Sequence, residues 1–200
     1  MTKARIAVMV SGGGTNLQAL IDAQKNGIIQ SGEIVLVISN NANAYALERA
    51  SKVEIATEVV IKKNLGSQIA FEERIKELIA KYQIDLIVLA GFMSILSENF
   101  TKEYPERILN VHPSLIPSFC GKGYYGLRVH EEALAYGVKV TGATVHFVNE
   151  IPDGGRILLQ KAVEIQEGDT PEILQRRVME QAEWKILPAA VEMVSKMLKG

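Results

Sequence analysis

The 200-residue sequence lacks most of the features that mark secreted, membrane and nucleic-acid-binding proteins. It has one cysteine, Cys120, which excludes a disulfide framework and a cysteine-based zinc cluster. No apolar run approaches the roughly 20 residues of a membrane-spanning helix, and the five apolar residues before Ser11 are too few for the core of a signal peptide. Lysine and arginine (22) balance aspartate and glutamate (23), so neither nucleic acid nor an anionic membrane is an expected partner. We therefore expect small-molecule substrates and a cytoplasmic location.

What the sequence does contain is typical of one globular α/β domain. Hydrophobic residues make up 48% of the chain, enough for one sizeable core, so residues 1–200 are predicted to form a single domain. Short apolar runs alternate with amphipathic stretches, and glycines, prolines or capping residues separate them. This alternation predicts a three-layer, mostly parallel, twisted Rossmann-like sheet, with an antiparallel pair of strands towards the C-terminus and a long final helix.

The expected elements follow one another along the whole chain. Capping residues mark three helix starts, at Thr15 or Asn16, at Ser67 and at Thr170. Pro188 predicts an irregularity in the last helix. The expected strands are 6–10, 34–38, 56–60, 84–90, one that carries Asn110, 141–148 and 157–164; the expected helices are 15–26, 44–52, 68–82, a turn or short helix over 95–100, 127–136 and one from 171 towards 198.

A glycine loop, Ser11-Gly12-Gly13-Gly14-Thr15-Asn16, joins the first strand to the first helix. It is not a dinucleotide fingerprint, because Leu17 stands where the third glycine is needed, and it is not a P-loop, because no Gly-Lys-Ser/Thr follows. The free N–H groups of a helix start can hold a phosphate monoester, and the Thr15 and Asn16 side chains can add hydrogen bonds. We favour a phosphate site over a tight turn with ordinary capping.

A second group of polar residues lies where the strand around Asn110 gives way to a loop. Alternation along a strand puts Asn110 and His112 on one face, and Asp153 follows later on a glycine turn. An amide donor for a developing oxyanion, an imidazole and a carboxylate that raises the imidazole pKa suit acyl-type transfer. A histidine in a turn is the simpler alternative, and His146 is expected to be a hydrogen-bonded sheet residue. The proline- and glycine-rich segment 113–126 is expected to be a mobile loop.

Taken together, these segments resemble the phosphoribosylglycinamide formyltransferase family of purine synthesis. Several long matches occur in the family's order and cover nearly the whole chain, which is much more specific than any one motif. The matching segments are 11–19, 89–96, 109–117, and 142–148 together with 153–155.

The resemblance implies a formyltransferase fold and a defined reaction. The formyl group of 10-formyltetrahydrofolate, a co-substrate, would pass directly to the amine of 5′-phosphoribosylglycinamide in a ternary complex, without a metal. The implied catalytic residues are Asn110, His112 and Asp153; those that bind the acceptor are Gly14, Thr15, Asn16 and Glu183; those that bind the folate are Gln68, Met93, Ser94, Ile95, Leu96 and Asn110.

The sequence departs from the family where the folate is held. Members often carry arginines near Gln68 and near Ser94, and neither position is basic here, so the partner of the glutamate tail is open. Lys122 and Arg128 are candidates to compensate for the missing charge. The resemblance leaves open whether the protein is a monomer or a homodimer.

Four other functions are alternatives to this one. A formyltetrahydrofolate hydrolase or an initiator-tRNA formyltransferase would share the Asn-x-His segment, but such proteins usually carry another domain. A metal hydrolase could use His112, His146 and Asp153, although their spacing matches no zinc motif. A phosphosugar sensor would bind the acceptor without consuming formyl folate.

Overall fold

The computed structural model describes residues 2–200, and its seven strands form one sheet in the order β3-β2-β1-β4-β5-β6-β7. The first five strands in sequence run parallel to one another, whereas β6 is antiparallel to both β5 and β7. The predicted mostly parallel sheet with an antiparallel C-terminal pair is therefore confirmed. The strands are β1 (Ala4–Val10), β2 (Gly32–Ser39), β3 (Ala56–Val59), β4 (Leu86–Leu89), β5 (Ile108–His112), β6 (Val140–Phe147) and β7 (Ile157–Glu164).

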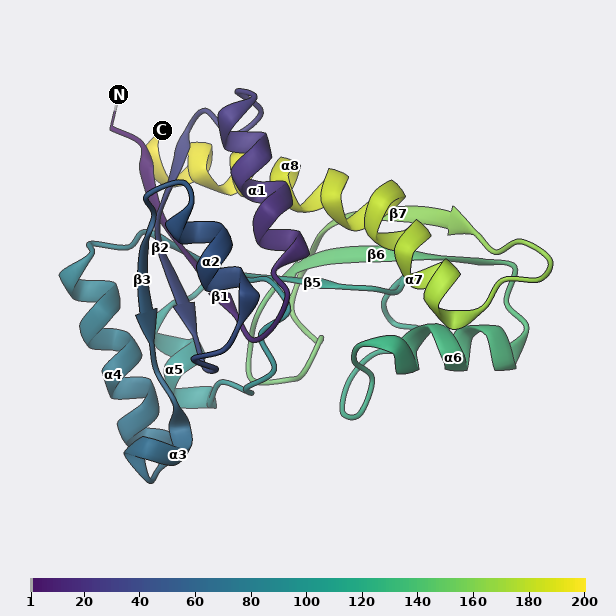
Figure 1. Ribbon diagram of the computed structural model, residues 1–200, viewed down its shortest axis with the longest axis horizontal. Helices are drawn as coiled ribbons and strands as arrows, with labels where there is room; N and C mark the ends of the chain where they lie inside the picture. The colour runs from purple at the N-terminus through teal and green to yellow at the C-terminus, as the bar shows by residue number, and fades with distance from the viewer. Residues whose placement is uncertain (1) are drawn as a thin grey trace.

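Helices cover both faces of the sheet and make the three predicted layers (Figure 1). The helices α1, α2 and α8 bury side chains in one apolar cluster, and α4 and α5 bury theirs in a second cluster on the opposite face. Helix α6 packs against α7 beside the antiparallel strands. The helices are α1 (Thr15–Lys25), α2 (Tyr45–Ser51), α3 (Lys62–Leu65), α4 (Gln68–Lys81), α5 (Glu98–Glu103), α6 (Leu127–Tyr136), α7 (Pro171–Val178) and α8 (Trp184–Lys199).

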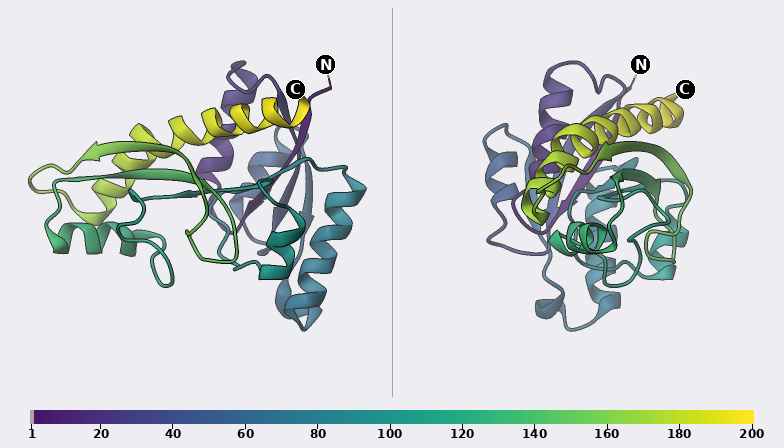
Figure 2. Two further views of the ribbon diagram at one scale, coloured as in Figure 1. Left: turned by 180° about the vertical axis from the view of Figure 1, so that it is seen from behind. Right: turned by 90° about the vertical axis from the view of Figure 1, so that its right-hand side faces the viewer.

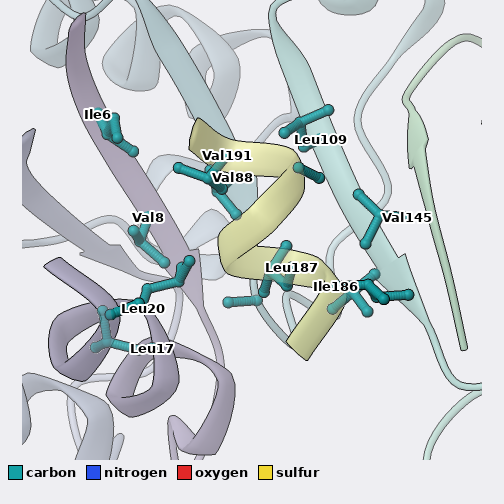
Figure 3. Close-up of a cluster of buried hydrophobic side chains, with 14 of the residues drawn as sticks. Ile6, Val8, Leu17, Leu20, Val88, Leu109, Val145, Ile186, Leu187 and Val191 are labelled. Carbon is teal, nitrogen blue, oxygen red and sulfur yellow. The ribbon is translucent and has the colours of Figure 1, made fainter. Parts of the chain in front are cut away.

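The final helix joins the two parts of the sheet. Figure 3 shows Ile186, Leu187 and Val191 of α8 among the side chains of the parallel strands and of β6, and all three are buried. Each such side chain contributes about 1.5–3 kcal/mol when it leaves water. The end of α8 returns to β1, as Figure 2 shows, and there Lys199 pairs with Asp85 at 2.8 Å. The helix thus fixes the antiparallel strands, which carry part of the site, to the parallel ones.

Several helix ends are where the sequence predicts them. The hydroxyls of Ser67 and Thr170 accept hydrogen bonds from the first turns of α4 and α7, and Gly137 ends α6 in a left-handed conformation. The first helix is different, because its N-cap is Gly14 (φ 72°) and not Thr15 or Asn16. The Asn16 side chain is unavailable as a cap because it bonds elsewhere.

The irregularity of the last helix is also not where it was expected. A π-helical segment, η1 (Met179–Glu183), separates α7 from α8, and Pro188 lies inside α8 in the core. A π turn holds more residues than an α turn and is often found next to functional sites. Glu183 is the last residue of this segment and lies at its junction with α8. The short helix expected over 95–100 instead begins at Glu98.

Three parallel strands end at the edge of the sheet where ligands are expected. The chain passes from β1 outwards to β2 and β3, then returns to β4 on the other side of β1, so the order reverses between β1 and β4. In open α/β sheets such a reversal marks the binding crevice, at the carboxyl ends of the strands. The glycine loop, residues 90–97 and residues 113–126 all leave this edge. Within residues 2–200, none of the helices has the length and apolar character to cross a membrane.

Candidate active site

The structure brings together the three residues proposed for chemistry. Asn110 and His112 lie at the end of β5, and Asp153 lies in the connection from β6 to β7 with a left-handed backbone (φ 56°). Nδ1 of His112 is 3.5 Å from Oδ2 of Asp153, and Nδ2 of Asn110 is 3.5 Å from Oδ1 of the same carboxylate. β6 is antiparallel to both β5 and β7, so the connection between β6 and β7 lies beside β5. Asp153 therefore lies next to Asn110 and His112, which are about forty residues earlier in the chain.

His146 orients the amide of Asn110. The register places the two residues opposite each other on β5 and β6. Nδ1 of His146 donates to the carbonyl of Phe147 (2.8 Å), so in the neutral ring Nε2 is free to accept the Asn110 amide hydrogen at 3.2 Å. The expectation of a hydrogen-bonded sheet histidine is confirmed, and its partner is one of the proposed catalytic residues.

His112 is less basic than its carboxylate neighbour suggested. Burial lowers the pKa of His112 below its ordinary value, and the charge of Asp153 and the carbonyl of Phe119 only partly offset this. The expected effect of Asp153, which is to raise the imidazole pKa, is confirmed. Burial outweighs it, because only 5% of the side chain is exposed and desolvation disfavours the cation. Nε2 lies 2.9 Å from the Phe119 carbonyl, which can only accept, so Nε2 carries a hydrogen. The proton that makes the ring cationic therefore sits on Nδ1, facing Asp153.

Asp153 remains charged although it is largely buried. Burial acts to raise its pKa, but the contact with His146, the His112 ring and the backbone N–H of Gly121 together lower the pKa below its ordinary value. The Gly121 N–H donates to Oδ2 at 2.8 Å. The segment 113–126 thus contacts two of the three residues, His112 through Phe119 and Asp153 through Gly121.

The glycine loop lies at the end of β1, and α2 packs closely against it at Gly14. Gly14 has φ 72°, and a Cβ there would lie 2.6 Å from the Cβ of Ala46 in α2. Nothing lies within 4 Å of a Cβ on Gly12 or Gly13, so these two face open space. Ser11 accepts the backbone N–H of Met93 at 2.8 Å, which ties the loop to the segment after β4. The arrangement can receive an anion at the start of α1.

Two of the residues assigned to the acceptor touch each other. Nδ2 of Asn16 donates to Oε2 of Glu183 at 2.7 Å, although the two are far apart in sequence. Burial raises the pKa of Glu183 to about 7, and the Asn16 hydrogen bond opposes the rise. Oδ1 of Asn16 is buried and has no partner within residues 2–200. A buried acceptor without a donor suits a ligand hydroxyl.

Two adjoining cavities are lined by the catalytic trio (Asn110, His112 and Asp153) and by most of the residues assigned to the folate. The larger, about 610 Å³, is lined by His112, Asn110, Asp153 and Lys122 among others, and the smaller, about 130 Å³, reaches His146. Met93, Ser94, Ile95 and Leu96 line one cavity or both.

Gln68 lies behind the folate-assigned segment and not in either cavity. It donates to the carbonyl of Ile95 at 3.1 Å and to Glu72, whose carboxylate also binds Ser97. Of the two basic residues considered as substitutes, Lys122 lines the larger cavity, whereas Arg128 pairs with Glu132 at 3.7 Å.

Some residues near the site were missed. His130 is fully buried, and burial lowers its pKa to about 4. Its spacing to Val129 and Ala133 marks the buried stripe of α6 and could have revealed this. The contacts of Phe119 and Gly121 use backbone atoms, for which the sequence carries no signal. In the described part of the chain, no group of three or more His, Cys, Asp or Glu residues suited to a metal is found.

Comparisons with known proteins agree on one family. A sequence profile of the family described as formyl transferase matches residues 4–191. The chain is 43% identical to phosphoribosylglycinamide formyltransferase of Haemophilus influenzae over 94% of this chain and 85% of that protein. It is 46% identical to the trifunctional purine biosynthetic protein adenosine-3 of Bos taurus over 96% of this chain, but it spans only 18% of that protein's length. A crystal structure of glycinamide ribonucleotide transformylase 1 from Symbiobacterium toebii superposes with a TM-score of 0.90 at 41% identity, over 98% of this chain and 89% of that one.

Proposed function

The chain belongs to the formyl transferase family, within its phosphoribosylglycinamide formyltransferase group, and we propose that it transfers the formyl group of 10-formyltetrahydrofolate to the amine of 5′-phosphoribosylglycinamide in purine nucleotide biosynthesis. The observation that carries this proposal is the convergence of Asn110, His112 and Asp153 on one cavity beside the glycine loop. A phosphorylated acceptor and a formyl donor can then meet at one edge of the sheet.

In the proposed reaction the acceptor nitrogen attacks the formyl carbon, and a C–N bond forms as the carbonyl oxygen becomes an oxyanion. The Asn110 amide has one N–H committed to His146 at 3.2 Å, while the other makes only a long bond of 3.5 Å to Asp153. That second N–H is the donor offered to the oxyanion. The amine loses one proton to water, and His112 takes one up from water as the oxyanion forms. The intermediate collapses as its bond to the folate nitrogen breaks, and His112 passes its proton to that nitrogen.

His112 and Asp153 act together in this proposal. His112 is mainly neutral in the resting site because burial lowers its pKa. When negative charge develops on the intermediate, a proton on Nδ1 of His112 is stabilised by both the oxyanion and Asp153, 3.5 Å away. The carboxylate thus favours the cation when the reaction needs it. No covalent enzyme intermediate is required.

The acceptor is proposed to bind with its phosphate at the start of α1. The backbone N–H groups of Gly14, Thr15 and Asn16 would hold the phosphate, and Oδ1 of Asn16 and the carboxyl of Glu183 would receive the ribose hydroxyls. Support comes from the unpartnered Oδ1 and from the 2.7 Å bond that links Asn16 to Glu183. Holding both reactants together replaces a bimolecular encounter, which is worth several kcal/mol, about 7 or more in well-oriented cases.

The folate is proposed to lie along the segment from Met93 to Leu96. The exposed apolar side chains of Met93 (54%) and Ile95 (70%) offer it a surface, and Asn110 bounds the same cavities. Gln68 supports this segment through the Ile95 carbonyl. Lys122 is the candidate partner for the carboxylates of the glutamate tail, because it is the lysine that lines the larger cavity.

We also propose that residues 1–200 work as a single formyltransferase domain in the cytoplasm, on small molecules, without a bound metal, as a monomer or a homodimer. One assay separates this function from its alternatives: the protein is mixed with each substrate alone and with both, and deformylated folate is followed by absorbance. Formyl transfer requires both substrates and survives a chelator. Consumption of folate without acceptor would indicate a hydrolase, and acceptor binding without consumption would indicate a sensor.

His112→Ala should abolish most of the turnover, and near-normal turnover in this variant would remove the histidine from the mechanism.

A further inference from the structure

Helix α2 packs against the glycine loop and donates hydrogen bonds to two of its carbonyl oxygens. The N–H of Ala46 donates to the carbonyl of Gly12 at 3.1 Å, and Nε of Arg49 donates to the carbonyl of Gly13 at 2.8 Å. Carbonyl oxygens beside a phosphate would repel it. Because α2 binds these two, the N–H groups at the start of α1 are left to face an anion.

The guanidinium of Arg49 is held in one place. Nη1 donates to Oε1 of Gln18 in α1 at 3.0 Å, Nε holds the loop, and the group lies 5.0 Å from the centre of the Tyr45 ring. It therefore bridges α2, the loop and α1. A bonded and stacked arginine loses little entropy when it meets a ligand.

Within residues 2–200, Arg49 forms no salt bridge. Arg74, Arg156 and Arg176 pair with glutamates at 2.7–3.0 Å, whereas no carboxylate of residues 2–200 lies within ion-pair range of Arg49. Only two of its bonds go to protein oxygens, and a guanidinium has five N–H donors. Arg49 also lines a small cavity together with Thr15, Trp184 and Asp22. The Asp22 carboxylate accepts a hydrogen bond from Gln18 and forms no salt bridge with Arg49.

We propose that Arg49 completes the phosphate site: it is a positioning residue that turns the Gly13 carbonyl away from the ligand, and it supplies the positive charge that attracts the acceptor phosphate. This inference rests on the acceptor site proposed above. It explains how a chain with a net charge of −1 can hold a dianion at a loop that has no lysine or arginine of its own.

The single tryptophan gives a direct readout of binding. Trp184 shares its cavity with Thr15 and Arg49, so its fluorescence should report a ligand at the loop without any formyl transfer. Ribose 5-phosphate is titrated against wild type, R49Q, R49K and R74Q, with uncharged ribose as the second ligand. R74Q is the matched control, because Arg74 is exposed and pairs with Glu77 on the other face of the sheet.

We expect R49Q to weaken ribose 5-phosphate binding by about tenfold, the usual effect of losing one charge-assisted hydrogen bond. R49K, which keeps the charge, should fall between R49Q and wild type, while R74Q should match wild type. Ribose binding should not respond to any of the variants. In the full assay the KM of the acceptor should rise by a similar factor, with kcat and the KM of the folate within about threefold of wild type.

Two results would overturn the inference. One is ribose 5-phosphate binding in R49Q within about twofold of wild type. The other is an equal rise in both KM values, which a general loss of structure would produce. If ribose 5-phosphate binds through Arg49 and no formyl transfer is detected, the proposed function fails and this inference stands.

Discussion

The glycine loop and the trio around Asn110 occupy the same edge of the sheet but are built in opposite ways. The loop uses consecutive residues, 11–16, and offers mainly backbone N–H groups. The trio uses side chains from β5 and from the β6–β7 connection, and it depends on the protonation of His112 and Asp153. The loop is therefore suited to binding a constant charge, and the trio to stabilising a charge that appears during the reaction. Variants of the trio should lower kcat, and variants of the loop should raise the KM of the acceptor.

The largest expected effect is on turnover in Asn110→Ala. Removing one oxyanion donor lowers kcat by roughly 10²–10³. The acceptor KM should change little, because the Asn110 side chain bonds His146 and Asp153 and is not one of the groups proposed to hold the phosphate or the ribose. Steady-state kinetics with both substrates measure the two parameters. Asn43→Ala, at an exposed position in the turn before α2, is the control. A large rise in KM with kcat unchanged would mean that Asn110 binds substrate and does not stabilise the intermediate.

The backbone donors of the acceptor site do not titrate, but the buried carboxyl of Glu183 does. The Glu183→Gln variant tests whether this carboxyl makes the stability of the protein depend on pH. The folded pKa of about 7 lies above the ordinary 4.5, so the stability that the neutral carboxyl contributes is complete below pH 4.5 and is lost as the pH rises through 7. The loss is about 3 kcal/mol for a fully buried group. In Glu183→Gln this pH dependence should disappear. Urea unfolding of both proteins at pH 4.5 and pH 8 measures it, and identical pH profiles would show that Glu183 ionises normally.

Asp153→Asn tests the electrostatic character of the trio. The carboxylate raises the pKa of His112 against the larger effect of burial, so its removal should lower that pKa further. Turnover should fall by about tenfold to a hundredfold, the effect of one or two pKa units. The limb of the pH–rate profile assigned to His112 should move to lower pH. A profile that keeps its midpoint would show that Asp153 holds the geometry only.

Gly14→Ala should have the smallest effect of the four variants, and it should weaken binding of the acceptor and leave turnover nearly unchanged. The new Cβ would lie 2.6 Å from Ala46 at a left-handed φ, which costs about 1–3 kcal/mol of stability and displaces the loop. The acceptor KM should rise by about tenfold with kcat nearly unchanged. Gly12→Ala, where a Cβ meets nothing within 4 Å, is the control for stability in thermal melts. A loss of kcat without a change in KM would contradict the separation of the two regions.

Local interactions account for what the sequence predicted well. The caps at Ser67 and Thr170 and the glycine that ends α6 each depend on residues within one turn, so their types are enough to place them. Strand alternation put Asn110 and His112 on one face for the same reason. The resemblance between sequences extended these local signals to the family.

The predictions from sequence that were wrong or incomplete depend on contacts between distant segments. Asn16 was expected to cap a helix and instead binds Glu183, and Pro188 was expected to disturb a helix that is already interrupted at 179–183. For His112 the sequence predicted the effect of the carboxylate, which does raise its pKa, but not the burial that outweighs this effect.

By itself the sequence determined the order of strands and helices, most of their ends, the glycine loop and the types of residue available for catalysis. Only the tertiary structure decided that Asp153 reaches His112, that His146 holds Asn110 and that Arg49 has no carboxylate partner among the described residues, 2–200. The physical reason is range: caps, turns and alternation act over a few residues. Burial, pKa and contacts across the sheet depend instead on which distant segments fold together.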